Sequence, residues 1–253
     1  MVSKRTETRI LETSKMDLTG RACLVTGATK GIGRAIAEAL AAAGADVVVS
    51  ARTSSNVERV AGEVDADSAG RVVGIAADVS RTEDCLRLVR ETVDALGRLD
   101  VLVNNAGVGV LQSIEDLSIE DWQTQINTNL RGVYCCSKAA VPHLKATAGW
   151  IVNIGSLAGR NPFAGGSGYN ASKFGLVGMT EAMMLDLRHS GIRVSIVMPG
   201  SVDTRFSGDY PEGGRAWALG ADDVASAVLH LLSYPDNAHV SRVEMRPSRP
   251  PKK

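Results

Sequence analysis

The sequence predicts an α/β fold, a three-layer arrangement in which a doubly wound parallel sheet of about seven strands lies between helices on both faces. Two observations support this prediction. Short segments rich in valine and isoleucine alternate along the chain with longer amphipathic segments. The short segments are also nearly continuous in their apolar character, which is typical of parallel strands buried on both faces by crossover helices.

The predicted elements follow one another in strict alternation. The apolar segments predicted as strands are, in chain order, ACLVTG, DVVVSA, VVGIAA, DVLVNNAG, WIVNIGS and RVSIVMPG. The amphipathic stretches between and after them predict helices over residues 32–43, 55–66, 82–96, 119–146, 168–190 and 222–233.

The chain of 253 residues is long enough for one large α/β domain. No linker interrupts residues 16–246, so we expect a single domain there. Residues 1–15 are polar, and residues 247–253 are rich in proline and basic side chains. We expect both ends to be flexible extensions.

The composition limits the classes of molecule that the protein could bind. Lysine plus arginine and aspartate plus glutamate both total 28, so no net charge favours nucleic acid or an anionic membrane. No apolar run approaches the roughly 18 residues that span a bilayer. The cysteines Cys23, Cys85, Cys135 and Cys136 lack metal-like spacing, and no secretory segment precedes them. These features predict reduced thiols, no metal site and a cytoplasmic location.

A glycine-rich loop joins the first strand to the first helix. The segment LVTGATKGIGRAIAEAL carries Gly27, Gly31 and Gly33, with a spacing that differs from G-x-G-x-x-G. Glycines let a backbone turn tightly and approach a pyrophosphate, whose charge is met by amides at the helix N-terminus. We therefore predict a dinucleotide loop, although a plain strand-to-helix turn is the alternative. The predicted cofactor contacts here are Gly27, Thr29, Lys30, Gly31, Ile32 and Gly33.

The end of the second strand bears on the choice of cofactor. Sites that bind NAD usually carry an acidic side chain there, but this strand ends VVVSAR, with Arg52 in that place. Lys30 adds a second cation in the glycine loop. Two cations suit a 2′-phosphate, so the sequence favours NADP(H) over NAD(H). The alternative is that both are solvated surface cations.

The stretch GGSGYNASKFG places Tyr169 four positions before Lys173. The pKa of a tyrosine is near 10, too high for efficient acid–base chemistry at neutral pH unless the phenolate is stabilised. A cation one helical turn away shares the helix face and lowers that pKa. By itself the pair could equally be two surface neighbours.

Several motifs occur in a characteristic order. They are TGATKGIG (26–33), NNAG (104–107), NTNLRGVY (127–134), IVNIGS (151–156), YNASK (169–173) and PGSVDT (199–204). With these motifs in register, the chain resembles the short-chain dehydrogenase/reductase family over nearly all of residues 16–235. The resemblance implies a Rossmann-type fold and an NAD(P)-dependent oxidoreductase that acts on CH–OH or C=O groups.

The resemblance also implies roles for four side chains. Tyr169 would be the general acid/base, and Ser156 would hydrogen-bond the substrate oxygen. Lys173 would hold the nicotinamide ribose hydroxyls and lower the tyrosine pKa. Asn129 would position a water that links Lys173 to solvent, whereas the nearby Asn127 is not assigned this role. Each of these residues could also have a purely structural role. Only their convergence in space would distinguish a catalytic role from a structural one.

Further cofactor contacts are implied by the same resemblance. Asp78 and Val79 would lie beside the adenine. The ribose and pyrophosphate would contact Asn105, Ala106 and Gly107. The nicotinamide would contact Pro199, Gly200, Val202 and Thr204.

The substrate is less well defined. Only a short, glycine-rich stretch separates Thr204 from the helix that starts near Asp222, and the chain lacks the TG...VDGG ending of acyl-carrier-protein reductases. We expect an open site for a small or medium carbonyl or alcohol compound, and these departures argue against a role in fatty-acid synthesis. Candidate lining residues are 107–111, Leu157, Phe163, Phe206, Tyr210 and Trp217.

The expected function is NADP(H)-dependent reduction of a ketone or aldehyde. One alternative is an NAD-dependent alcohol dehydrogenase. Another is a cofactor-binding subunit without turnover, against which the intact Tyr169, Lys173, Ser156 and Asn129 argue. The family resemblance further suggests a homodimer or homotetramer built on the helices near 119–146 and 168–190.

Overall fold

The computed structural model describes residues 16–204, 206 and 215–251. These residues form a seven-stranded parallel sheet in the order β3-β2-β1-β4-β5-β6-β7. The order reverses direction between β1 and β4, as in doubly wound Rossmann-like folds. The predicted fold class is therefore confirmed. The strands are β1 Ala22–Thr26, β2 Asp46–Ala51, β3 Val72–Ala76, β4 Val101–Asn104, β5 Trp150–Ile154, β6 Arg193–Pro199 and β7 Arg242–Met245.

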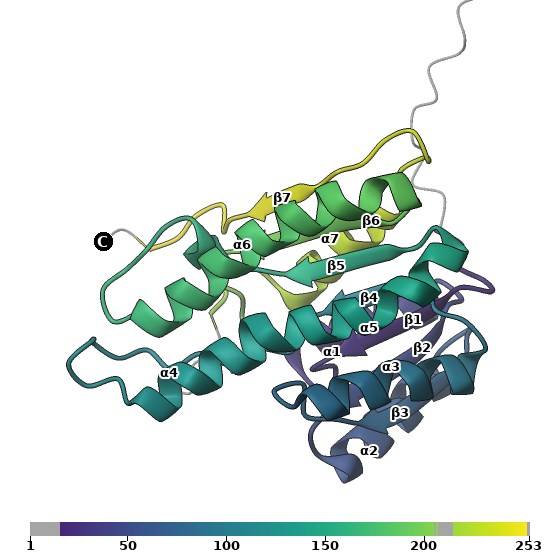
Figure 1. The fold of residues 1–253 in the computed structure, drawn as a ribbon, viewed down its shortest axis with the longest axis horizontal. Helices are drawn as coiled ribbons and strands as arrows, with labels where there is room; N and C mark the ends of the chain where they lie inside the picture. The colour runs from purple at the N-terminus through teal and green to yellow at the C-terminus, as the bar shows by residue number, and fades with distance from the viewer. Residues whose placement is uncertain (1–15, 205, 207–214, 252–253) are drawn as a thin grey trace, which may run out of the picture.

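Helices cover both faces of the sheet (Figure 1). One layer consists of α1 Gly31–Ala42, α2 Ser54–Ala66 and α7 Ala221–Leu232. The opposite layer consists of α3 Thr82–Leu96, α5 Gly132–Thr147 and α6 Ser167–Leu187. Helix α4, Ile119–Ile126, extends this second layer and packs against α6. No helix among the described residues is long and apolar enough to cross a membrane.

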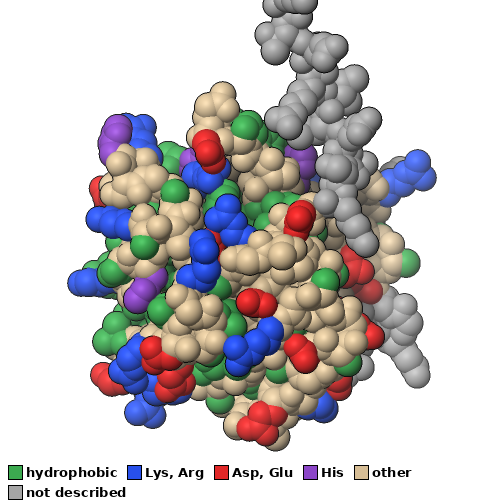
Figure 2. Space-filling view, turned by 90° about the vertical axis from the view of Figure 1, so that its right-hand side faces the viewer, with side chains coloured by type: hydrophobic (Ala, Val, Ile, Leu, Met, Phe, Trp, Pro, Cys, Tyr) green, Lys and Arg blue, Asp and Glu red, His purple; other side chains and the backbone are tan. Residues whose placement is uncertain are grey.

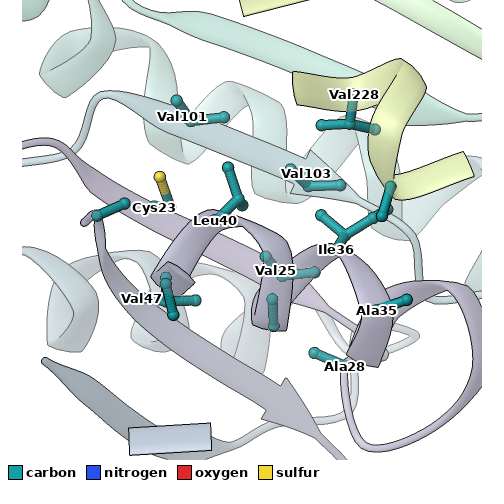
Figure 3. Packing of buried hydrophobic residues seen from close by; sticks show 14 of the residues in the cluster. Cys23, Val25, Ala28, Ala35, Ile36, Leu40, Val47, Val101, Val103 and Val228 are labelled. Carbon is teal, nitrogen blue, oxygen red and sulfur yellow. The ribbon is translucent and has the colours of Figure 1, made fainter. Parts of the chain in front are cut away.

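The sheet is buried as its valine-rich strands predict. All five residues of β1 and of β5 are buried. Figure 3 shows Ile36 and Leu40 of α1 packed over Val25, Val101 and Val103 of the central strands. Because apolar side chains fill both faces, the strands form a rigid base from which the loops at their carboxyl ends project.

The seventh strand was not among the apolar segments singled out in the sequence. β7 has the sequence RVEM, with one exposed and three half-buried residues, and it pairs only with β6 at the edge of the sheet. Edge strands commonly carry charged side chains, which limit pairing with other chains. Such a strand lacks the continuous apolar run that marks the six predicted segments.

The long helix predicted over 119–146 is interrupted. A π-helical turn, Asn127–Arg131, lies between α4 and α5. Turns of this kind are rare and occur frequently at functional sites. This one carries Asn129, whose side chain is buried.

Asp100 ties β1 to β4 at the amino ends of the strands. Its buried carboxylate accepts hydrogen bonds from Ala22 N at 2.9 Å, from Arg21 Nη1 at 2.9 Å, and from Arg98. Figure 2 shows the face at this end of the molecule, where basic and acidic side chains are interspersed. The two central strands are thus fixed at the edge opposite the candidate site.

Candidate active site

The site is built at the carboxyl ends of β1, β4, β5 and β6. Parallel strands bring these ends to one edge of the sheet, and ligands of open α/β sheets bind there, where the strand order reverses. The glycine loop, NNAG, the end of IVNIGS and PGSVDT lie at these strand ends, whereas NTNLRGVY spans the π turn and α5, and YNASK lies in the first turns of α6.

The glycine loop has the backbone that its sequence predicts. Gly27 and Gly31 have φ values of +64° and +55°, in the left-handed region that favours glycine. A β-carbon added at Gly33 would lie 2.3 Å from Asn105 Nδ2 and 2.4 Å from the Gly27 carbonyl oxygen. The loop after β1 and the loop after β4 therefore touch through a position that only glycine fits.

Thr26, at the end of β1, was missed by the sequence analysis. Its Oγ1 accepts hydrogen bonds from Asn105 N at 3.0 Å and from Ala106 N at 3.1 Å. Asn105 Nδ2 in turn donates to Thr26 O at 2.9 Å and to Gly27 O at 3.0 Å. The sequence feature that could have identified Thr26 is its hydroxyl side chain, which ends an otherwise apolar strand directly before the glycine loop.

Helix α1 begins with amides that no side chain caps. Its N-cap residue, Lys30, makes no side-chain capping bond, and its first turn contains no acidic residue. Free amides and the helix dipole favour an anion at this position. The glycine cradle and these amides fit the pyrophosphate of a dinucleotide. Thr29, Gly31 and Ile32 line this turn and are half-buried.

Lys30 and Arg52 are both exposed. Within the described part of the chain, neither side chain forms an ion pair or a hydrogen bond. Arg52 directly follows β2, as predicted, and no carboxylate stands at that strand end. Both cations are thus available to a ligand.

The remaining predicted cofactor residues lie in the loops after β3 and after β6. Asp78 Oδ1 accepts hydrogen bonds from Ser80 N at 3.0 Å and Ser80 Oγ at 2.8 Å, which fixes the turn after β3. Val79 is buried.

The Thr204 methyl group would lie 3.3 Å from a β-carbon at Gly31, so the segment after β6 closes against the glycine loop. Pro199 ends β6, Gly200 N donates to Met245 O at 2.8 Å, and Val202 pairs with Leu219.

Ser156, Tyr169 and Lys173 converge. Lys173 is buried, and its Nζ donates to Ile154 O at 3.0 Å and lies 5.8 Å from the centroid of the Tyr169 ring. Ser156 is hydrogen-bonded to Tyr169, and its Oγ also accepts from Ala158 N at 3.1 Å. The end of β5 and the first turns of α6 thus supply one cluster.

Asn129 is connected to this cluster indirectly. Its Nδ2 donates to Ser172 Oγ at 3.0 Å, and Ser172 Oγ donates to Tyr169 O at 2.8 Å. Its amide also bonds Val108 twice, accepting from N and donating to O, each at 2.8 Å. The described contacts of Asn129 therefore reach the backbone of α6 and the loop after β4, but not Lys173 itself.

Burial controls the acidity of both titrating groups. It raises the pKa of Tyr169 above its ordinary value, and the hydrogen bond with Ser156 only partly opposes this. Burial lowers the pKa of Lys173 to about 8. The expected lowering of the Tyr169 pKa by Lys173 is not found in the protein alone. The reason is that burial of the phenol disfavours the phenolate, and only the hydrogen bond with Ser156 acts in the opposite direction.

Phe206 covers one side of Tyr169. The two ring centroids are 5.8 Å apart, and the ring planes are inclined by 56°. A β-carbon at Gly109 would lie 2.7 Å from Phe206 Cε1 and 3.5 Å from Tyr169 Cδ2. Two predicted lining residues, Gly109 after β4 and Phe206 after β6, therefore meet at the ring of Tyr169.

The other predicted lining residues are dispersed. Leu157 packs near Gly200, and Phe163 packs near Gly166. Leu111 and Trp217 are 48% and 37% exposed, so neither is enclosed by the described residues. Tyr210 lies outside the residues that the structure describes.

Comparison with known proteins agrees with this geometry. A family model described as short chain dehydrogenase matches residues 21–213. An uncharacterized oxidoreductase of Staphylococcus saprophyticus is 34% identical over 233 residues, which cover 92% of this chain and 99% of the relative.

Two solved structures have the same fold. The alcohol dehydrogenase of the archaeon Thermococcus sibiricus, complexed with 5-hydroxy-NADP, superposes with a TM-score of 0.86 at 30% identity, covering 92% of this chain and 99% of that one. A short chain dehydrogenase from Burkholderia cenocepacia, in complex with NADP, gives a TM-score of 0.83 at 37% identity, covering 90% and 97%.

Proposed function

Since this chain belongs to the short-chain dehydrogenase family, we propose that it is an NADP(H)-dependent reductase of a small or medium ketone or aldehyde. Membership itself makes the chain an NAD(P)-dependent oxidoreductase that acts on CH–OH or C=O groups. The observation that carries the finer proposal is the convergence of Ser156, Tyr169 and Lys173 at the edge of the sheet that holds the glycine cradle.

Tyr169 is the proposed acid. Because burial raises its pKa, the phenol keeps its proton at neutral pH, which is the state that reduction of a carbonyl requires. Ser156, already hydrogen-bonded to Tyr169, would donate to the same carbonyl oxygen as negative charge develops there. A protonated Tyr169 therefore fits the role of proton donor in the proposed reduction.

Lys173 and Asn129 are proposed to support that proton transfer. With a pKa of about 8, Lys173 is mostly protonated at neutral pH and can hold ribose hydroxyls. Asn129 would position a water that returns a proton from solvent toward Lys173. The bound cofactor supplies the hydride, while these side chains orient the carbonyl and supply the proton.

NADP(H) is the proposed cofactor. The free, exposed Lys30 and Arg52 support this choice because each can pair with a 2′-phosphate. The solved structures from Thermococcus sibiricus and Burkholderia cenocepacia hold 5-hydroxy-NADP and NADP. The alternative is an NAD-dependent alcohol dehydrogenase, in which both cations would face solvent.

A substrate panel tests this proposal. Purified full-length protein is assayed with aldehydes, diketones and β-ketoesters by loss of NADPH absorbance, and again with NADH. We expect turnover of at least one carbonyl compound with a higher kcat/KM for NADPH. Equal use of NADH would contradict the cofactor choice. Cofactor binding without any turnover would favour a non-catalytic subunit.

A homodimer or homotetramer is proposed through α4, α5 and α6. These helices expose large apolar side chains, namely Trp122, Tyr134, Phe174 and Leu185. Light scattering that gives a monomer at micromolar concentration would contradict this assembly. The cytoplasmic location also stays a proposal, supported by four buried, free cysteines.

A further inference from the structure

We propose that Gln125 is a positioning residue that holds the segment Val108–Val110 in place and so sets the substrate-facing wall beside Tyr169. The inference rests on the proposed function, because it takes this segment as a wall of the carbonyl site. Gln125 lies in α4 and is fully buried, and its Oε1 accepts a hydrogen bond from Val110 N at 3.1 Å.

Gln125 and Asn129 act on the segment as a pair. Asn129, one helical turn further on, accepts a hydrogen bond from Val108 N at 2.8 Å. The two amide side chains therefore hold the segment at two points, Val108 N and Val110 N.

The segment so held faces the reacting groups. Gly109 stands between the two bonded valines, and a β-carbon there would lie 3.5 Å from Tyr169 Cδ2 and 2.7 Å from Phe206 Cε1. A shift of this segment would change the space next to the Tyr169 ring. Gln125 does not itself touch that ring in any described contact, so it acts through the segment.

The other end of the Gln125 amide faces α6. A β-carbon at Gly168 would lie 2.5 Å from Gln125 Nε2, and Gly168 directly precedes Tyr169. The amide therefore separates the Val108–Val110 segment from the helical turn that carries Tyr169. It sets the distance between these two parts of the site.

Gln125 Nε2 is buried and has no hydrogen-bond partner among the described residues. A buried donor without a partner is destabilising, so an apolar side chain of the same length would serve packing alone at least as well. An apolar side chain could not supply the oxygen that accepts the hydrogen bond from Val110 N. This combination favours a role in positioning rather than in stability.

The test compares Gln125→Met, Gln125→Glu and Gln123→Met. The first removes the acceptor at similar length, the second keeps an acceptor oxygen, and the third makes the same change at an exposed position of the same helix. For Gln125→Met we expect KM for the carbonyl substrate to rise about tenfold, with a smaller change in kcat and unchanged affinity for NADPH. KM should stay near the wild-type value in Gln125→Glu and Gln123→Met.

Hydrogen exchange of the Val110 amide gives a readout that needs no turnover. It should be faster in Gln125→Met than in wild type and unchanged in Gln123→Met. If Gln125→Met does not fold, Gln125→Asn, whose shorter side chain cannot reach Val110 N, takes its place with the same expectations. Unchanged KM or unchanged exchange at Val110 would overturn the inference. A wild-type protein that reduces no carbonyl would refute the proposed function instead, while the exchange data would still decide the role of Gln125.

Discussion

The ring of Phe206 packs against the ring of Tyr169, with centroids 5.8 Å apart and planes inclined by 56°. Phe206 is 46% exposed, so it shields Tyr169 while contributing little to the core. We therefore expect a substrate bound beside the Tyr169 ring to contact this side chain. The contact links the segment after β6 directly to the proposed acid.

Replacing Phe206 with alanine should weaken substrate binding more than it weakens the fold. We expect KM for an apolar ketone to rise several-fold, since an aromatic contact contributes roughly 0.5–1.5 kcal/mol. Leu86→Ala is the control, because Leu86 lies on α3, outside the proposed subunit contact, and is 51% exposed. Steady-state kinetics with both variants checks this, and equal KM values in the two would contradict the assigned contact.

Lys173 should make stability depend on pH in the alkaline range. Its pKa is lowered from 10.5 to about 8 in the folded protein, so between these values the unfolded chain binds more protons than the folded one. The free energy of unfolding should then rise with pH from about 8 to about 10.5, by at most ~1.4 kcal/mol per pH unit. Below pH 8 the lysine is protonated in both states and contributes no slope.

Urea unfolding of wild type and Lys173→Met, across the same pH range, isolates this contribution. The difference in unfolding free energy between the two proteins should change with pH only in that window. A difference that is constant with pH would show that Lys173 has an ordinary pKa. It would then also remove the argument that burial controls the titration of this site.

Gly33 should not tolerate a β-carbon, whereas Gly62 should. At Gly33 the new atom would meet Asn105 Nδ2 at 2.3 Å, and at Gly62, inside α2, it would meet nothing within 4 Å. We expect Gly33→Ala to lower stability by about 1–3 kcal/mol and to weaken cofactor binding. Gly62→Ala should raise stability by roughly 0.5–1 kcal/mol. Thermal unfolding and NADPH titration measure both effects, and a neutral Gly33→Ala would refute the close approach of the two loops.

The pair Lys30 and Arg52 should determine the preference for NADPH. The double substitution Lys30→Ala and Arg52→Ala should lower kcat/KM for NADPH by about tenfold or more, because charged hydrogen bonds contribute roughly 1.5–3 kcal/mol. The value for NADH should change little. Arg188→Ala, an exposed cation beyond the far end of α6, should leave both values unchanged. Equal losses for the two cofactors would contradict a 2′-phosphate contact.

The inner strands could be predicted because burial on both faces leaves a direct trace in the sequence, as VVV in β2 and VLV in β4 illustrate. β7 left no such trace, since its RVEM sequence serves an edge. The helical region around Asn129 was predicted, but the π turn was not, because five residues of i→i+5 bonding shift the side-chain register over too short a stretch to be recognised in the sequence.

At the site, Ser156, Tyr169 and Lys173 were predicted from the order of motifs, and the structure places them together. Thr26 and Gln125 were missed. Thr26 acts on Asn105, which is 79 positions away in the chain, and Gln125 acts on a backbone amide rather than on a motif. The burial that raises the Tyr169 pKa in the protein alone was not predicted either, since helix spacing gives the distance of a cation but not the burial of the phenol.

The proposed mechanism depends most directly on Tyr169 as the proton donor. The decisive measurement is the turnover of Tyr169→Phe with the best carbonyl substrate, made together with NADPH titration of the same preparation. We predict that turnover falls by about a hundredfold or more, while the affinity for NADPH and the thermal stability stay close to wild type. Retained turnover in a folded variant that binds NADPH would contradict the mechanism.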